Sequence, residues 1–177
     1  MPADQRLVIV EDSTELDPDH PHVVRMQART ANVEGAGVVS LRDLVRQALR
    51  MRPDRLVLGE VRGAEVVDLL AAMNTGHEGG AGTVHANSAA DVPARLEALG
   101  LTAGLDRLAV HALMGAGIDA VLHLGRDDAG RRVLQGVHVL DRGASGFVTT
   151  APALIRQGAH LVAADGMPRL QAMLGRG

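Results

Sequence analysis

The sequence contains no lysine, and all 18 of its basic residues are arginine. A phosphate-binding P-loop needs a glycine-rich turn followed by lysine and serine or threonine, because the lysine charge reaches the β- and γ-phosphates. These 177 residues therefore cannot supply such a loop. The same absence excludes Schiff-base chemistry through lysine. Cysteine is absent too, which excludes disulfides and thiolate metal sites and fits a cytoplasmic location.

Aromatic residues and long apolar runs are also scarce. Phe147 is the one aromatic residue, so the core has to be built from leucine, valine, alanine, methionine and isoleucine. No apolar run approaches the roughly 18 residues of a membrane span, so any membrane association is expected to go through partners. The formal charge of −3 gives no bulk attraction to nucleic acid, and we predict no direct nucleic-acid binding.

Short apolar strands alternate with amphipathic helices along the chain. Leu7–Val10 and Leu56–Leu58 have the pattern of buried strands, and a short strand is expected over Thr83–Ala86. Ser40 and Asp43 form a capping box at the start of a helix that Pro53 should stop. Alternation of this kind predicts an α/β fold with a mostly parallel sheet flanked by helices.

The C-terminal part has a different pattern. A turn over residues 127–130 joins two strand-like segments, which predicts an antiparallel hairpin. We therefore expect a partial α/β core over residues 1–126, a β appendage over 127–156 and a loosely structured tail over 157–177.

Polar side chains follow three of the predicted strands. Ligands bind at the carboxyl ends of the strands in open α/β sheets. One such residue is often a helix cap or a solvated loop residue, but three strand ends that converge in a parallel sheet favour a site. The residues are Glu11 and Asp12, then Glu60 and Arg62, then His85, Asn87 and Ser88.

The needs of phosphoryl transfer match this set of groups. That reaction uses a metal ion, an acid that orients the attacking water, and cations for the developing charge. Glu60 is placed to orient or activate water. Glu11 and Asp12 could hold the hydration shell of Mg²⁺. His85 could form a hydrogen bond with a phosphate or with the attacking water.

Three ordered motifs resemble those of the secretion ATPases of the type II/IV superfamily. Val8–Asp12 with Glu15-Leu16 resembles the aspartate box, and residues 50–63 resemble the family's atypical Walker B segment, in which glycine precedes the glutamate. Residues 72–79 followed by 82–88 resemble the histidine box. The resemblance covers residues 6–142, and the subfamily most resembled is that of the Flp or tight-adherence pilus ATPases, also labelled conjugal-transfer-associated ATPases.

The resemblance implies a RecA-like fold and ATP hydrolysis with Mg²⁺. It also implies a hexameric ring with an inner-membrane platform protein as partner, and a cytoplasmic location at the inner face of the membrane through partners. By this resemblance, Glu60 activates the attacking water, and Glu11 and Asp12 lie on the side of the bound metal. His85 is the histidine that senses the phosphate. The other implied residues are Arg25 and Arg29, which match arginines that approach the nucleotide, and Arg62 and His77, which lie inside the motifs.

The departure from the family is that its N-terminal domain, first core strand and P-loop precede the point where this sequence starts. We therefore expect a gap or exposed edge in the sheet and little ATP hydrolysis by the chain alone. The chain is then a truncated or mis-started motor, one half of a motor whose P-loop half is a separate chain, or a remnant. A non-catalytic interaction module that binds motor subunits or the membrane platform is the alternative. A metal-dependent hydrolase built on His77, His85 and the acids is disfavoured, because no ligand pair has standard metal spacing.

Overall fold

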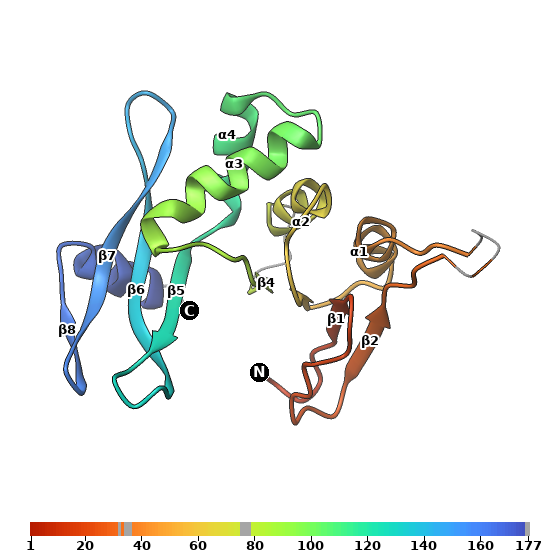
Figure 1. Ribbon diagram of the computed structural model, residues 1–177, viewed down its shortest axis with the longest axis horizontal. Coiled ribbons are helices and arrows are strands. Elements are labelled where there is room, and N and C mark those ends of the chain that lie inside the picture. Colours follow the sequence, from red (N-terminus) through yellow and green to blue (C-terminus); the bar gives the residue numbers. More distant parts are fainter. Residues whose placement is uncertain (32, 34–36, 75–78, 176–177) are drawn as a thin grey trace. The chain divides into compact units, whose positions relative to one another are not determined.

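The computed structural model describes residues 1–31, 33, 37–74 and 79–175. The chain forms two compact units (Figure 1). One contains residues 1–85 and 98–106, and the other contains residues 86–97 and 107–177. The boundaries expected at 126/127 and 156/157 stay a prediction.

The first unit is built on a four-stranded parallel sheet in the order β2-β1-β3-β4. All five residues of the central strand β1 are buried, as its apolar sequence predicts. Two helices, α1 and α2, pack against each other in this unit. The bounds are β1 Leu7–Glu11, β2 Val23–Gln27, α1 Leu41–Arg50, β3 Arg55–Leu58, α2 Glu65–Met73 and β4 Ala81–Gly82.

Helix α1 confirms the local sequence signals. The Ser40 side chain accepts a hydrogen bond from the Asp43 amide and the Asp43 side chain accepts one from the Ser40 amide, which completes the capping box. The helix ends at Arg50. Arg52, just before Pro53, has a φ of 51°, in the left-handed region that non-glycine residues rarely adopt.

The second unit contains a four-stranded antiparallel sheet in the order β5-β6-β7-β8. Helix α5 covers one part of it around a small core of Val139, Ala153 and Leu170. The helix α3 crosses the division between the two units. The bounds are η1 Ala89–Asp91 (a 3₁₀ turn), α3 Val92–Thr102, α4 Arg107–Gly117, β5 Ala120–Arg126, β6 Arg132–Arg142, β7 Val148–Gln157, β8 His160–Ala163 and α5 Met167–Leu174.

The fold class is confirmed, and the antiparallel part is larger than a hairpin. The turn predicted at 127–130 is present, with the Gly130 amide donating to the Asp127 carbonyl at 2.8 Å. The tail was expected to be loosely structured, but β8 and α5 form there because Gly158 turns the chain at a φ of 60° and Leu170 is buried under the sheet. The strand expected over Thr83–Ala86 lies earlier, at β4. Within the described ranges, no helix has both the length and the apolar character to cross a membrane.

Candidate functional site

Four polar side chains gather at the carboxyl ends of β1, β3 and β4. Asp12 follows β1, Glu60 follows β3 and His85 follows β4. The Arg62 guanidinium forms an ion pair with Asp12, and its Nε lies 3.7 Å from Glu60 Oε2. His85 Nε2 lies 3.4 Å from Glu60 Oε1. The structure thus brings together residues from all three predicted motifs within the first unit.

This cluster is open to solvent, so a ligand can reach it. The Asp12 and Glu60 side chains are each 34% exposed, and that of His85 is 85% exposed. Asp12 Oδ2 is itself buried and, among the described residues, makes no hydrogen bond beyond its ion pair with Arg62. Two carboxylates and a guanidinium therefore share one accessible edge of the sheet.

The Glu11 side chain differs from that of its neighbour Asp12 in its burial and in its hydrogen-bond partners. Its side chain is buried, and Oε1 accepts hydrogen bonds from the amides of Glu15 at 3.1 Å and Leu16 at 3.0 Å. A Cβ on Gly59 would lie 2.8 Å from Glu11 Cγ, so any larger residue there requires the Glu11 side chain or the strand end to move. In the structure Glu11 holds the loop after β1 in place. Its expected catalytic and metal-side roles stay a prediction.

Two positioning residues near the cluster were missed by the sequence reasoning. Glu65 Oε1 accepts hydrogen bonds from the amides of Arg62 and Gly63. Thr83 accepts from the Val61 amide at 2.8 Å, and its hydroxyl donates to the Gly59 carbonyl. An acid at the start of a helix was a signal for the first. The second lies inside the segment that resembles the histidine box, but the resemblance gave it no role.

The remaining predicted residues lie elsewhere. Arg25 forms an ion pair with Asp17. Arg29 Nε donates to the Gly37 carbonyl at 2.7 Å. His77 lies outside the described residues. The structure therefore assigns other partners to the two arginines, and their approach to a nucleotide stays a prediction.

The oxygen donors of the cluster suit a magnesium ion that is bound together with phosphate. Mg²⁺ in phosphoryl-transfer proteins takes one or two carboxylates, several waters and substrate phosphates. Asp12 and Glu60 provide two carboxylates, both within ion-pair distance of Arg62. Over the described part of the chain, no group of three or more His, Cys, Asp or Glu residues could hold a metal ion by itself.

Comparison with known proteins agrees with these motifs. Residues 1–148 match the family model described as type II/IV secretion system protein. The chain belongs to the type II/IV secretion system protein family.

Relatives of this secretion-family chain include proteins named for conjugal transfer. A putative conjugal transfer protein of Mycobacterium tuberculosis strain H37Rv is 65% identical over 145 residues, covering 82% of this chain and 41% of the relative. The conjugal transfer protein TrbB of Rhizobium radiobacter is 32% identical over 158 residues, covering 89% of this chain and 46% of the relative.

A solved structure of a type IV secretion system ATPase has a similar fold. The VirB11 ATPase of the Brucella suis type IV secretion system, in complex with sulphate, superposes with a TM-score of 0.67 and 29% identity, covering 78% of this chain and 41% of that one. This secretion-family chain thus spans less than half the length of these relatives.

Proposed function

We propose that this chain is the part of an ATP-hydrolysing secretion motor that carries the water-activating acid. The observation that carries the proposal is the convergence of Asp12, Glu60, Arg62 and His85 at the carboxyl ends of neighbouring parallel strands. The motor would couple hydrolysis to export of pilin or another substrate. It would act as a hexameric ring at the inner face of the membrane, against a membrane-embedded platform protein.

Each side chain has a role that its position supports. Glu60 is the acid that orients and activates the attacking water, because its carboxylate is accessible and lies between Arg62 and His85. Asp12 and Glu60 would hold Mg²⁺ through its waters, and the bound metal supplies neutralising charge to the phosphates. His85, as the most exposed member, would contact the phosphate.

Arg62 has two carboxylate partners and keeps them apart. Its guanidinium offers donors to Asp12 and to Glu60 in one fork. It screens the repulsion between the two acids while no cation is bound. With Mg²⁺ and nucleotide bound, the Arg62 guanidinium would be able to donate to phosphate, for which the arginine fork is well shaped.

The lysine of the P-loop, which binds the phosphates, has to come from outside these 177 residues, because the sequence contains no lysine. It would belong to a further part of the same protein or to a separate P-loop-containing chain. The 177 residues by themselves are therefore expected to hydrolyse ATP slowly or not at all.

The test is ATP turnover by the chain alone and by the chain mixed with a polypeptide that carries the N-terminal, P-loop-containing part of a conjugal transfer relative. Turnover should appear in the mixture only and be lost with Glu60→Gln. Asp165→Asn, which changes an exposed acid in the second unit, is the matched control and should keep full turnover. A mixture that associates on size-exclusion chromatography but gives no turnover contradicts the proposal.

A non-catalytic interaction module is the second candidate. It is favoured by the missing lysine together with the ion pair that already occupies Asp12. In that case Glu60→Gln leaves both association with motor subunits and secretion in cells unchanged. The two candidates therefore differ in the effect of one substitution.

A further inference from the structure

Two arginines face each other at the open end of the antiparallel sheet. Arg126 at the end of β5 lies directly opposite Arg132 at the start of β6. Like charges at directly opposed positions of neighbouring strands destabilise a sheet. Arg126 donates to the Gly130 carbonyl at 2.6 Å, and Asp127 is bound by Arg131. Neither opposed arginine forms an ion pair with a carboxylate among the described residues.

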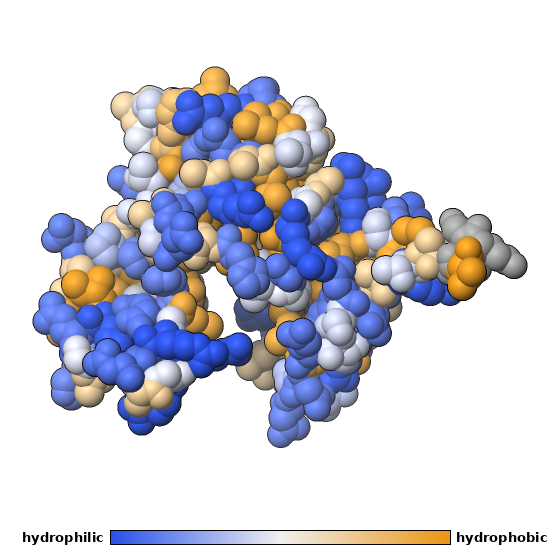
Figure 2. All heavy atoms as spheres, viewed as in Figure 1, coloured by the Kyte–Doolittle hydropathy of each residue, from blue (hydrophilic) through white to orange (hydrophobic). Residues whose placement is uncertain are grey.

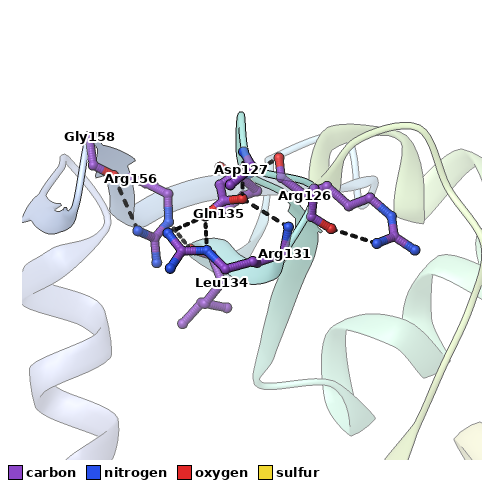
Figure 3. A network of polar contacts seen from close by, with 9 residues as sticks. Arg126, Asp127, Arg131, Leu134, Gln135, Arg156 and Gly158 are labelled. Atoms are coloured by element: carbon purple, nitrogen blue, oxygen red, sulfur yellow. Dashed lines mark hydrogen bonds and ion pairs between the residues drawn. The ribbon is translucent and has the colours of Figure 1, made fainter.

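A third arginine belongs to the polar network around this turn. Figure 3 shows the polar network around the turn, in which Arg156 from β7 donates to the Leu134 carbonyl at 2.7 Å. Its Nη1 also donates to the Gly158 carbonyl at 3.2 Å. Residues 126–132 contain three arginines and two aspartates in a chain whose net charge is −3, so this turn has a local positive charge that attracts anionic groups although the protein as a whole does not.

An apolar row leads up to the two arginines on the same face. Successive side chains of a strand alternate between faces, so Leu122, Leu124 and Arg126 share one. Leu122 and Leu124 are 64% and 65% exposed. They lie opposite Val137 and Leu134 of β6. Val137 packs against the small core under α5, so the exposed leucines extend an apolar face that the helix leaves partly open.

The strand that carries this row is also an edge of its sheet. The order β5-β6-β7-β8 gives β5 one partner strand, β6, within the described residues. The outer side of an edge strand presents amide and carbonyl groups that can pair with another chain. Figure 2 shows that the surface over the hairpin turns of this unit is mainly hydrophilic, with hydrophobic atoms beside them.

We propose that the β5 edge, with Leu122, Leu124 and Arg126 on β5 and Leu134 and Arg132 beside them on β6, binds an extended segment of a partner protein whose every second side chain, all on one face, is apolar beside the leucines and acidic beside the arginines. The segment would add a strand to the sheet. Its backbone would pair with β5, its apolar side chains would cover the leucines, and its carboxylates would neutralise the opposed arginines. This surface lies in the second unit and shares no residue with the proposed catalytic cluster.

An anionic membrane is the other partner with matching charge. It would neutralise the arginines and accept the leucines, but it offers no groups that pair regularly with the amides and carbonyls of a strand edge. An added strand satisfies the charges, the apolar row and the backbone together, and for that reason we favour the protein segment.

The experiment measures fluorescence anisotropy of the labelled peptide Thr-Val-Thr-Val-Thr-Glu-Thr, whose two valines and glutamate share one face when it is extended, titrated with the whole chain. Binding should weaken about tenfold in the double variant Arg126→Glu, Arg132→Glu and comparably in Leu122→Ser, Leu124→Ser. The double variant Arg50→Glu, Arg95→Glu reverses the same number of exposed arginines elsewhere and should bind as the unchanged chain does.

Backbone pairing is tested with the same peptide N-methylated at alternate amides, which should not bind. Equal binding of the methylated and unmethylated peptides overturns the added strand, as does no binding of either. Vesicles of phosphatidylglycerol that sediment the chain in an Arg126- and Arg132-dependent way, without peptide binding, assign the surface to a membrane instead. Circular dichroism checks that each variant is folded. If a double variant is unfolded, the single variant Arg132→Gln is used in its place.

Discussion

Oε1 of Glu65 accepts hydrogen bonds from the main-chain amides of both Arg62 and Gly63, each at 2.7 Å. Glu65 is buried in the first turn of α2, where the partial positive charge of the helix terminus also favours a carboxylate. One oxygen atom thus fixes the turn between β3 and α2, and with it the backbone position of the arginine that binds Asp12 and Glu60.

Replacing Glu65 with alanine should lower the free energy of unfolding by about 1–3 kcal/mol, because two amides lose their acceptor. Glu65→Gln keeps an acceptor oxygen and should cost less. Urea denaturation measures both. Glu15→Ala removes an exposed carboxylate and serves as the control. Equal stability of Glu65→Ala and the unchanged chain would show that the turn does not depend on this side chain.

Gly59→Ala should destabilise the chain by about 1–3 kcal/mol through overpacking. The added Cβ would come within 2.8 Å of Glu11 Cγ, so the Glu11 side chain or the strand end has to move. The control is Gly143→Ala, whose Cβ would have no neighbour nearer than 3.7 Å. Thermal unfolding of the two variants gives the comparison, and similar melting temperatures for both would refute the close approach.

Arg52→Gly should raise the free energy of unfolding by roughly 0.5–1 kcal/mol. The φ of 51° at Arg52 costs an L-residue with a Cβ more than it costs glycine, although glycine loses more chain entropy on folding. The opposite sign is expected for Gln47→Gly, which places glycine at an exposed position inside α1 at a cost of about 1 kcal/mol. Denaturant titration of the two variants side by side tests both expected changes in the free energy of unfolding. A loss of stability in Arg52→Gly contradicts the expected gain.

A buried histidine connects two helices and a strand of the second unit. His111 Nδ1 accepts a hydrogen bond from the Val148 amide at 2.9 Å, so its other nitrogen, Nε2, faces Glu97 Oε2 at 2.7 Å as the donor. Arg107 Nε also donates to Glu97, at 2.9 Å, and the Arg107 guanidinium stacks on Phe147, the single aromatic residue. The hydrogen bond from His111, followed by the one from Arg107, lowers the pKa of Glu97.

Lowering the pH should therefore reduce the stability of the second unit by protonating Glu97. Because the folded pKa is below the unfolded value, this stabilisation is present above the unfolded pKa of about 4.3 and is lost as pH falls through the lowered folded pKa. Glu97→Gln should be less stable than the unchanged chain at pH 7, and the difference should shrink below about pH 4. Thermal unfolding across this range measures it, and a difference that does not change with pH would contradict the assignment.

Local sequence signals predicted much of the fold. The capping box at Ser40, the buried run of β1 and the turn at 127–130 depend on neighbours in the sequence, and each is present. The structure of the tail beyond Gln157 was harder to predict from the sequence. The apolar residues of α5 are buried against the antiparallel sheet, so their role depends on residues distant in the sequence.

The site was predicted in outline and not in detail. Glu11 is the last residue of β1 and Asp12 follows it, so their side chains project to different sides and only one joins the cluster. Sequence spacing placed both at the strand end but did not say which would be buried. Arg25 and Arg29 found acceptors in neighbouring loops, which depend on loop conformations that no periodicity encodes.

The short strand β4 has a consequence for the kinetics of the cluster. Only two residues of it pair with β3, and Thr83 supplies the next hydrogen bonds, to Leu58 and Val61. A segment held by so few bonds at a sheet edge opens at a much lower free energy than the sheet unfolds. The Val61 amide, which donates to Thr83, should then exchange with deuterated solvent well before the amides of β1, and its exchange rate reports how often the segment around Thr83 opens.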